Sequence, residues 1–182
     1  MSILSQLGSL IGGEDAQRLA SGQGNFQSPD SPDVQRVQEM FSKLNPQQQQ
    51  QVFSQAAQQM NPQDYAAHMN PNAGGSSPLS NIGSAGLRTI ASTLLQHLGA
   101  GGITGNLLSR IPGLQTHDPA QMDQNQVAAL ARYTQQNHPD LFGRAAAQIG
   151  QQQPDLLHSF LGKAGLAIGA AALASHFMKT DQ

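Results

Sequence analysis

The sequence contains no cysteine and no tryptophan, and only 4% of its 182 residues are aromatic. Without cysteine the chain has no disulfide bonds, no thiolate metal ligands and no cysteine nucleophile. Strand patterns are lacking too, because no run of alternating β-branched or aromatic residues occurs. Together these absences predict an all-α fold.

Charge is scarce as well. Charged residues make up 11% of the chain and apolar residues 38%, against about 25% and 45–50% in a typical globular domain. The nine Lys and Arg residues are scattered and the net charge is −2, so no basic patch is present to bind phosphates and we expect no nucleic-acid partner. The low apolar content favours a protein that completes its burial on a partner or on other copies of itself.

Turn-forming residues divide the chain into segments. Residues 1–20 have an amphipathic pattern, residues 21–33 and 70–79 have the composition of linkers, residues 34–69 are expected to form a helical arm, and residues 80–179 a C-terminal helical domain. Asn-Pro and Pro-Asp pairs mark the helix starts, because an Asn side chain caps a helix and Pro suits its first position. We predict a small helical bundle of short Pro-capped helices with a flexible N-terminal arm and linkers.

The polar residues do not form a catalytic or metal-binding pattern. None of the six histidines lies four residues from another, which is the spacing that places two imidazoles on one helix face. The chain has neither a G-x-S-x-G nucleophile elbow nor a phosphate-binding loop. Capping accounts for the aspartates at expected helix starts, which are Asp30, Asp33, Asp118, Asp140 and Asp155. We therefore expect no enzymatic activity, no cofactor and no metal ion.

The first residues, MSILSQLGSLIGG, lack the positive segment and the cleavage site of a secretory signal. Their apolar residues recur at helical spacing and predict a short helix that ends at Gly12 and Gly13. We expect this helix to dock on the body of the protein, or to contact a membrane surface or another copy, although it lacks the basic residues that membrane-surface helices favour. The contact residues would be Ile3, Leu4, Leu7, Leu10 and Ile11.

The least polar run in the chain is AGLAIGAAALAS, at residues 164–175. It is too short and too rich in Ala and Gly for a lone bilayer span, which needs about 20 mostly apolar residues. Small residues recur every four positions, and this spacing lets two helix backbones approach closely. Because a glycine inside a helix costs about 1 kcal/mol relative to alanine, we expect a tight helix contact, within or between chains, to offset that cost. The predicted contact residues are Gly162, Gly165, Ile168, Gly169, Ala172 and Leu173.

This run fits three roles: the central helix of a bundle, the contact helix of a self-associating protein, or a sleeve around a lipophilic molecule. The first hypothesis is a non-enzymatic interaction or scaffolding protein that self-associates, or docks on a larger complex, through its C-terminal helix. The alternative is an accessory subunit of an envelope or redox complex whose apolar helices contact membrane lipid or a quinone-like molecule. With no signal peptide and no convincing membrane span, we expect a cytoplasmic protein or one at the periphery of a membrane.

Overall fold

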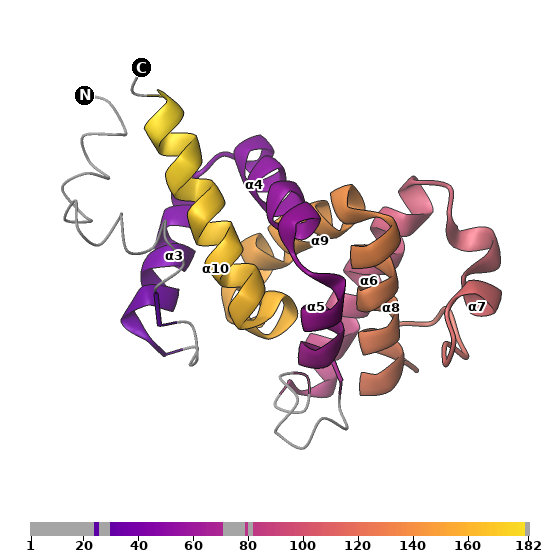
Figure 1. Cartoon of the computed structure of the whole chain (residues 1–182). Helices are drawn as coiled ribbons and strands as arrows, with labels where there is room; N and C mark the ends of the chain where they lie inside the picture. Colours follow the sequence, from indigo (N-terminus) through magenta and orange to yellow (C-terminus); the bar gives the residue numbers. More distant parts are fainter. Residues whose placement is uncertain (1–23, 26–29, 71–78, 80–81, 181–182) are drawn as a thin grey trace.

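The structure is a computed structural model that describes residues 24–25, 30–70, 79 and 82–180. Within these residues the fold is all-α, as predicted, with helices and no strands (Figure 1). The helices are α3 (Pro32–Lys43), α4 (Pro46–Gln59), α5 (Pro62–His68), α6 (Ser84–Ala100), the 3₁₀ helix η1 (Thr104–Asn106), α7 (Leu107–Arg110), α8 (Gln124–Asn137), α9 (Pro139–Gln152) and α10 (Pro154–Thr180).

The predicted Pro-capped helix starts are confirmed. Asn45 and Gln48 form a capping box at the start of α4, in which each side chain accepts a hydrogen bond from the other residue's backbone N–H, at 2.9 and 3.2 Å. Asn61 caps α5 by accepting from the Gln63 N–H at 2.9 Å. These bonds satisfy backbone donors that the first helical turn leaves unpaired.

The predicted roles of the aspartates are confirmed in part. Asp33, Asp140 and Asp155 lie in the first turns of α3, α9 and α10, where a carboxylate interacts favourably with the helix dipole. The prediction for Asp118 was wrong, because this residue closes a turn by accepting from the Ala120 N–H at 2.9 Å. The cap of the next helix, α8, is Asp123.

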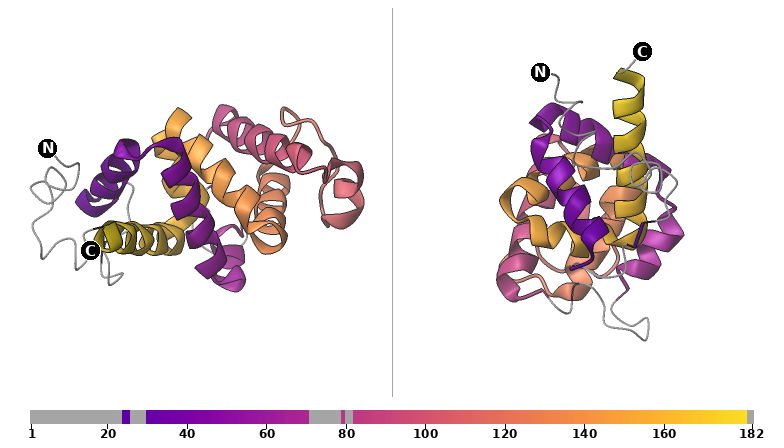
Figure 2. Two further views of the ribbon diagram at one scale, coloured as in Figure 1. Left: turned by 90° about the horizontal axis from the view of Figure 1, so that it is seen from above. Right: turned by 90° about the vertical axis from the view of Figure 1, so that its left-hand side faces the viewer.

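Helices α4 and α9 form the most extensive helix pair of the described structure, and α6, α8 and α10 pack around α9. At one end of the molecule, α3 lies beside the C-terminal half of α10, whereas η1 and α7 lie at the opposite end (Figures 1 and 2). The helices of residues 34–69 therefore pack directly on those of residues 80–179.

Aromatic side chains tie these two parts of the chain into one hydrophobic core. The Phe142 ring stacks on Phe160 with centroids 4.7 Å apart, and Tyr65 meets Phe142 edge-on at 5.2 Å. A second pair, Phe41 and Phe53, stacks at 4.4 Å between α3 and α4. All five rings are buried, and the contacts of Phe142 with Tyr65 and Phe160 join helices of both parts of the chain.

Buried glutamines take the place of cations at the ends of two helices. The Gln49 Nε2 donates to the carbonyl oxygens of Phe41 and Leu44, at 2.6 and 3.2 Å, at the end of α3. The Gln135 Nε2 donates to the carbonyls of Ala57 and Met60, at 3.3 and 3.2 Å, at the end of α4. A neutral amide satisfies these carbonyls without burying a charge.

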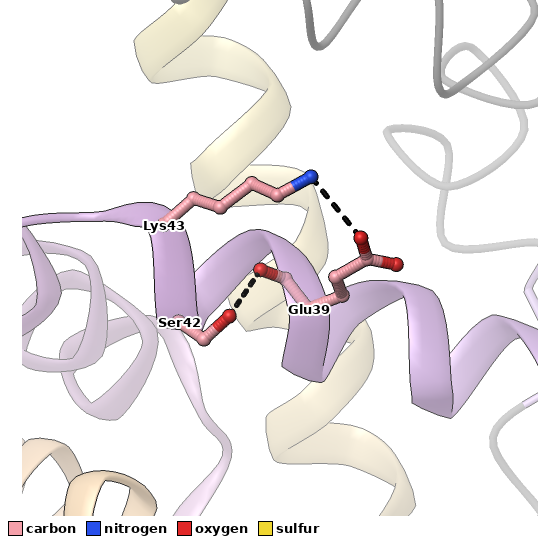
Figure 3. Close-up of polar contacts among 3 residues, drawn as sticks. All are labelled: Glu39, Ser42 and Lys43. Carbon is pink, nitrogen blue, oxygen red and sulfur yellow. Dashed lines mark hydrogen bonds and ion pairs between the residues drawn. The ribbon is translucent and has the colours of Figure 1, made fainter.

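An ion pair on the surface of α3 contributes little by comparison. The Lys43 Nζ lies 3.1 Å from the Glu39 Oε1, and Ser42 donates to the Glu39 carbonyl in the same turn (Figure 3). The side chains of Lys43 and Glu39 are 36% and 52% exposed, and exposed pairs at this spacing stabilise a helix by about 0.3–0.5 kcal/mol. This ion pair therefore contributes less than a helix cap, which is worth about 1 kcal/mol.

We expect Asn45→Ala to lower the free energy of unfolding by about 1 kcal/mol, because it removes the side-chain half of the capping box at the start of α4. Urea unfolding followed by circular dichroism measures the loss. The matched control is Gln47→Ala, an exposed position in the first turn of the same helix. Equal unfolding midpoints for the two variants would show that the cap contributes nothing.

Candidate interaction site

The predicted contact residues lie on α10, and α10 is broken at Gly162. This glycine has φ 69° and ψ 178°, a left-handed φ that residues with a Cβ avoid. The segments Pro154–Gly162 and Gly165–Leu173 lie at 112° to each other. The expectation that Gly162 continues the helix of the apolar run was therefore wrong, and the apolar run begins just after a sharp bend.

Side chains from α5 cover the bend. The Tyr65 hydroxyl donates to the Phe160 carbonyl at 3.0 Å, and the His68 Nε2 lies 3.3 Å from the Ser159 carbonyl oxygen. The His68 ring also lies against the α-carbon of Gly162, where an added Cβ would be 2.4 Å from Nε2. Helix α5 thus supplies hydrogen-bond donors to carbonyls in the last turn before the break.

Burial shifts the pKa values of both side chains. Desolvation raises the pKa of the Tyr65 hydroxyl well above 10.0, and the positive charge of Arg132 offsets only part of this effect. Desolvation lowers the pKa of His68 from its ordinary 6.5; the hydrogen bond to Ser159 opposes this effect and the charge of His158 adds to it. At neutral pH both groups are therefore uncharged hydrogen-bond donors.

Beyond the bend, the C-terminal half of α10 packs on α3 and on the end of α4. An added Cβ would lie 2.7 Å from the Met60 methyl carbon at Gly165 and 3.3 Å from the Phe41 ring at Gly169. These glycines therefore make room for side chains of their own chain, not for the backbone of another helix. Further buried residues of this half-helix are Leu166, Ala170, Ala172 and Leu173.

The closest backbone approach of two described helices at a glycine lies elsewhere, between α9 and α4. An added Cβ at Gly143 would lie 2.4 Å from the Ser54 nitrogen and 2.6 Å from its Cα. Gly143 is not among the contact residues predicted from the sequence. Its signal was present, since Gly143, Ala147 and Gly150 recur at helical spacing on α9.

One side of the C-terminal half of α10 remains partly exposed. Of the predicted contact residues there, Ile168 is half-buried, and Ala167 and Ala171 beside it are half-buried as well. Ala167 and Ile168 also pack in part against the hydrophobic core. No charged residue occurs from Gly165 to Leu173. We call Ala167, Ile168 and Ala171 the outer face of α10.

The remaining predicted contacts lie outside the described residues. They are the residues of the expected N-terminal helix: Ile3, Leu4, Leu7, Leu10 and Ile11. Their role stays a prediction, and the outer face of α10 is the part of the predicted interaction site that the structure describes.

The surface also holds a polar groove of about 690 Å³ between α4 and α9. Its charged groups are Asp140, which accepts a hydrogen bond from the Gln58 amide at 3.3 Å, and Arg144. Most of its lining side chains are glutamine amides, which both donate and accept hydrogen bonds. Among the described residues, no three His, Asp or Glu side chains are grouped to hold a metal ion. The other lining residues are Gln47, Gln50, Gln51, Val52, Ser54 and Gln55.

None of the described helices is by itself both long enough and apolar enough to cross a membrane. The two halves of α10 reach these limits only when they are taken together, across their 112° bend.

Comparison with known proteins yields no relative. Family models, curated proteins and solved structures were searched, and none matches this chain. The geometry of α10 and its neighbours is therefore the basis for the function proposed below.

Proposed function

We propose that this protein is a non-enzymatic helical interaction protein that self-associates through the outer face of α10. The observation that carries the proposal is the uncharged apolar strip of Ala167, Ile168 and Ala171, which lies on a half-helix set off by the bend at Gly162. An apolar face without charge leaves no unpaired charge when a partner covers it.

A second copy of the chain is the partner that this face fits. In a twofold dimer each copy presents the same surface, so the surface must be complementary to itself. The outer face has one large side chain, Ile168, flanked by the small Ala167 and Ala171. An isoleucine of one copy therefore fits against the alanines of the other, as a knob fits a hole between packed helices.

The test is Ile168→Asp, with the native mass measured by light scattering. We expect the wild type to give a multiple of its 19.2 kDa chain mass and Ile168→Asp to give a single chain, because the variant would bury an unpaired carboxylate in the contact. The matched control is Leu108→Asp. Leu108 is 43% exposed and lies on α7 at the opposite end of the molecule (Figure 1).

Two results would overturn self-association. One is a wild-type mass of 19.2 kDa at every protein concentration measured. The other is an Ile168→Asp variant that keeps the wild-type assembly. Substitutions at Gly165 and Gly169 are less informative here, because both glycines pack on Met60 and Phe41 of their own chain and a larger residue would disturb the fold itself.

The alternative function is contact with lipid, as an accessory subunit of a membrane complex. The observation that favours it is that the two halves of α10 together have the length and apolar composition of a span. Flotation with phosphatidylcholine and phosphatidylglycerol vesicles tests it, on the full chain and on a chain that lacks residues 1–13. Flotation of the full chain would support a lipid partner, and its absence would reject this alternative.

A further inference from the structure

We propose that the contacts of His68 with Ser159 and Gly162, which we call the latch, hold the bend of α10. Protonation of His68 in acid releases the C-terminal half of α10 from the bundle. The latch has one consequence that rests on the proposed function, namely that it controls how α10 is presented to a partner. The latch itself follows from contacts between α5 and α10.

The geometry makes the imidazole part of the hinge. The His68 ring occupies the space beside the α-carbon of Gly162, within 2.6 Å of where a Cβ would stand. Its Nε2 must carry a hydrogen, because the Ser159 carbonyl 3.3 Å away only accepts. The ring thus contacts the residue that sets the bend and a carbonyl of the last turn before it.

Acid changes the ring at its other nitrogen. With Nε2–H fixed by Ser159, the neutral ring has an unprotonated Nδ1, and a second proton there creates a cation in a partly buried place. Because burial lowers the pKa of His68 in the folded state, the released state binds more protons than the latched state below the ordinary pKa of about 6.5. Stability of the latch is therefore full above pH 6.5 and is lost as the pH falls towards the lowered folded-state pKa.

The groups around His68 reinforce this direction. From α10, His158 lowers the pKa of His68 by its positive charge. From α5, the Tyr65 ring lies 6.4 Å from the imidazole and is neutral, with a raised pKa, and Arg132 of α8 acts on that hydroxyl. Asp64 lies four residues before His68 on α5 and is exposed, so solvent screens its carboxylate. No negative charge is among the groups that shift the pKa of His68.

Release of the ring has a defined structural consequence. When the charged imidazole turns towards water, the Ser159 carbonyl loses its donor and the space beside Gly162 opens. Gly162 is then free to leave its left-handed φ, since the imidazole no longer fills the space beside it. The segment Gly165–Leu173, which packs on Met60 and Phe41, moves as one helix and exposes its buried face.

Hydrogen–deuterium exchange of the full chain at pH 7.5 and 5.0, corrected for intrinsic rates, tests the latch. We expect protection of residues 165–173 in the wild type to fall in acid, because the released state binds more protons than the latched state, while α9 keeps its protection. In His68→Gln, which stays neutral and keeps an N–H donor, we expect no pH-dependent loss. An NMR titration of the wild-type His68 ring gives a second measure that needs no variant.

Three results would overturn the latch: the same loss of protection in His68→Gln, an equal loss in α9, or a His68 pKa at or above 6.5. Exchange is measured on Ile168→Asp as well, so that the pH response of amide protection is also determined on a chain that lacks the proposed self-association contact. A pH response in that variant supports the latch even where the wild type proves monomeric, and no response there or in the wild type rejects it.

Discussion

Replacing Gly162 by alanine is expected to lower the free energy of unfolding by about 3 kcal/mol, the largest loss among the substitutions considered. Gly162 has φ 69° and ψ 178°, a conformation that is essentially restricted to glycine and costs a residue with a Cβ about 1–3 kcal/mol. The new methyl group would also lie 2.4–2.6 Å from three atoms of the His68 ring. Displacing the ring removes the hydrogen bond to the part-buried Ser159 carbonyl, and loss of such a hydrogen bond costs about 1 kcal/mol.

Gly102→Ala is the matched control for this substitution. Gly102 has φ 74°, close to that of Gly162, but nothing lies within 4 Å of an added Cβ there. It should therefore show the backbone strain alone, about 1 kcal/mol. Urea unfolding of both variants separates the strain from the contact with His68. Equal losses would show that the imidazole does not support the bend.

Gly143→Ala is expected to cost about 2 kcal/mol, the second largest effect. The atoms nearest to the added Cβ include the backbone nitrogen and Cα of Ser54, at 2.4 and 2.6 Å, so helices α9 and α4 must move apart. Overpacking of this kind costs about 3 kcal/mol at the upper end of its usual range, and the better helix propensity of alanine returns about 1 kcal/mol. Because α4 and α9 form the most extensive helix pair, the whole core is affected.

Gly150→Ala tests that prediction on the same helix. An added Cβ at Gly150 would be 3.3 Å from a methyl group of Leu157, the tip of a movable side chain. The helix propensity gain then dominates, and we expect unchanged stability or a gain of up to about 1 kcal/mol. Thermal unfolding of both variants gives the comparison. If Gly143→Ala proved as stable as Gly150→Ala, α4 and α9 would not be in close backbone contact.

The site was only partly predictable from the sequence. The small residues of α10 predicted a tight contact, and Gly165 and Gly169 are indeed buried, yet their neighbours are the Met60 and Phe41 side chains of the same chain. Residue spacing within one helix indicates that another element can approach this helix closely, but it does not indicate which element does so. The same pattern of small residues at Gly143 on α9 was not predicted as a contact, because it lies in a less apolar segment.

The sequence by itself determined the all-α class and most helix starts, including those at Pro46, Pro62, Pro139 and Pro154. These depend on hydrogen bonds and backbone preferences within a few residues, as in the capping box of Asn45. Only the tertiary structure decided the bend of α10. The Phe160 and Ser159 carbonyls in the last turn before the bend accept from Tyr65 and contact His68, which lie 95 and 91 residues away from them in the chain. No sequence pattern near Gly162 indicates donors so distant in the chain.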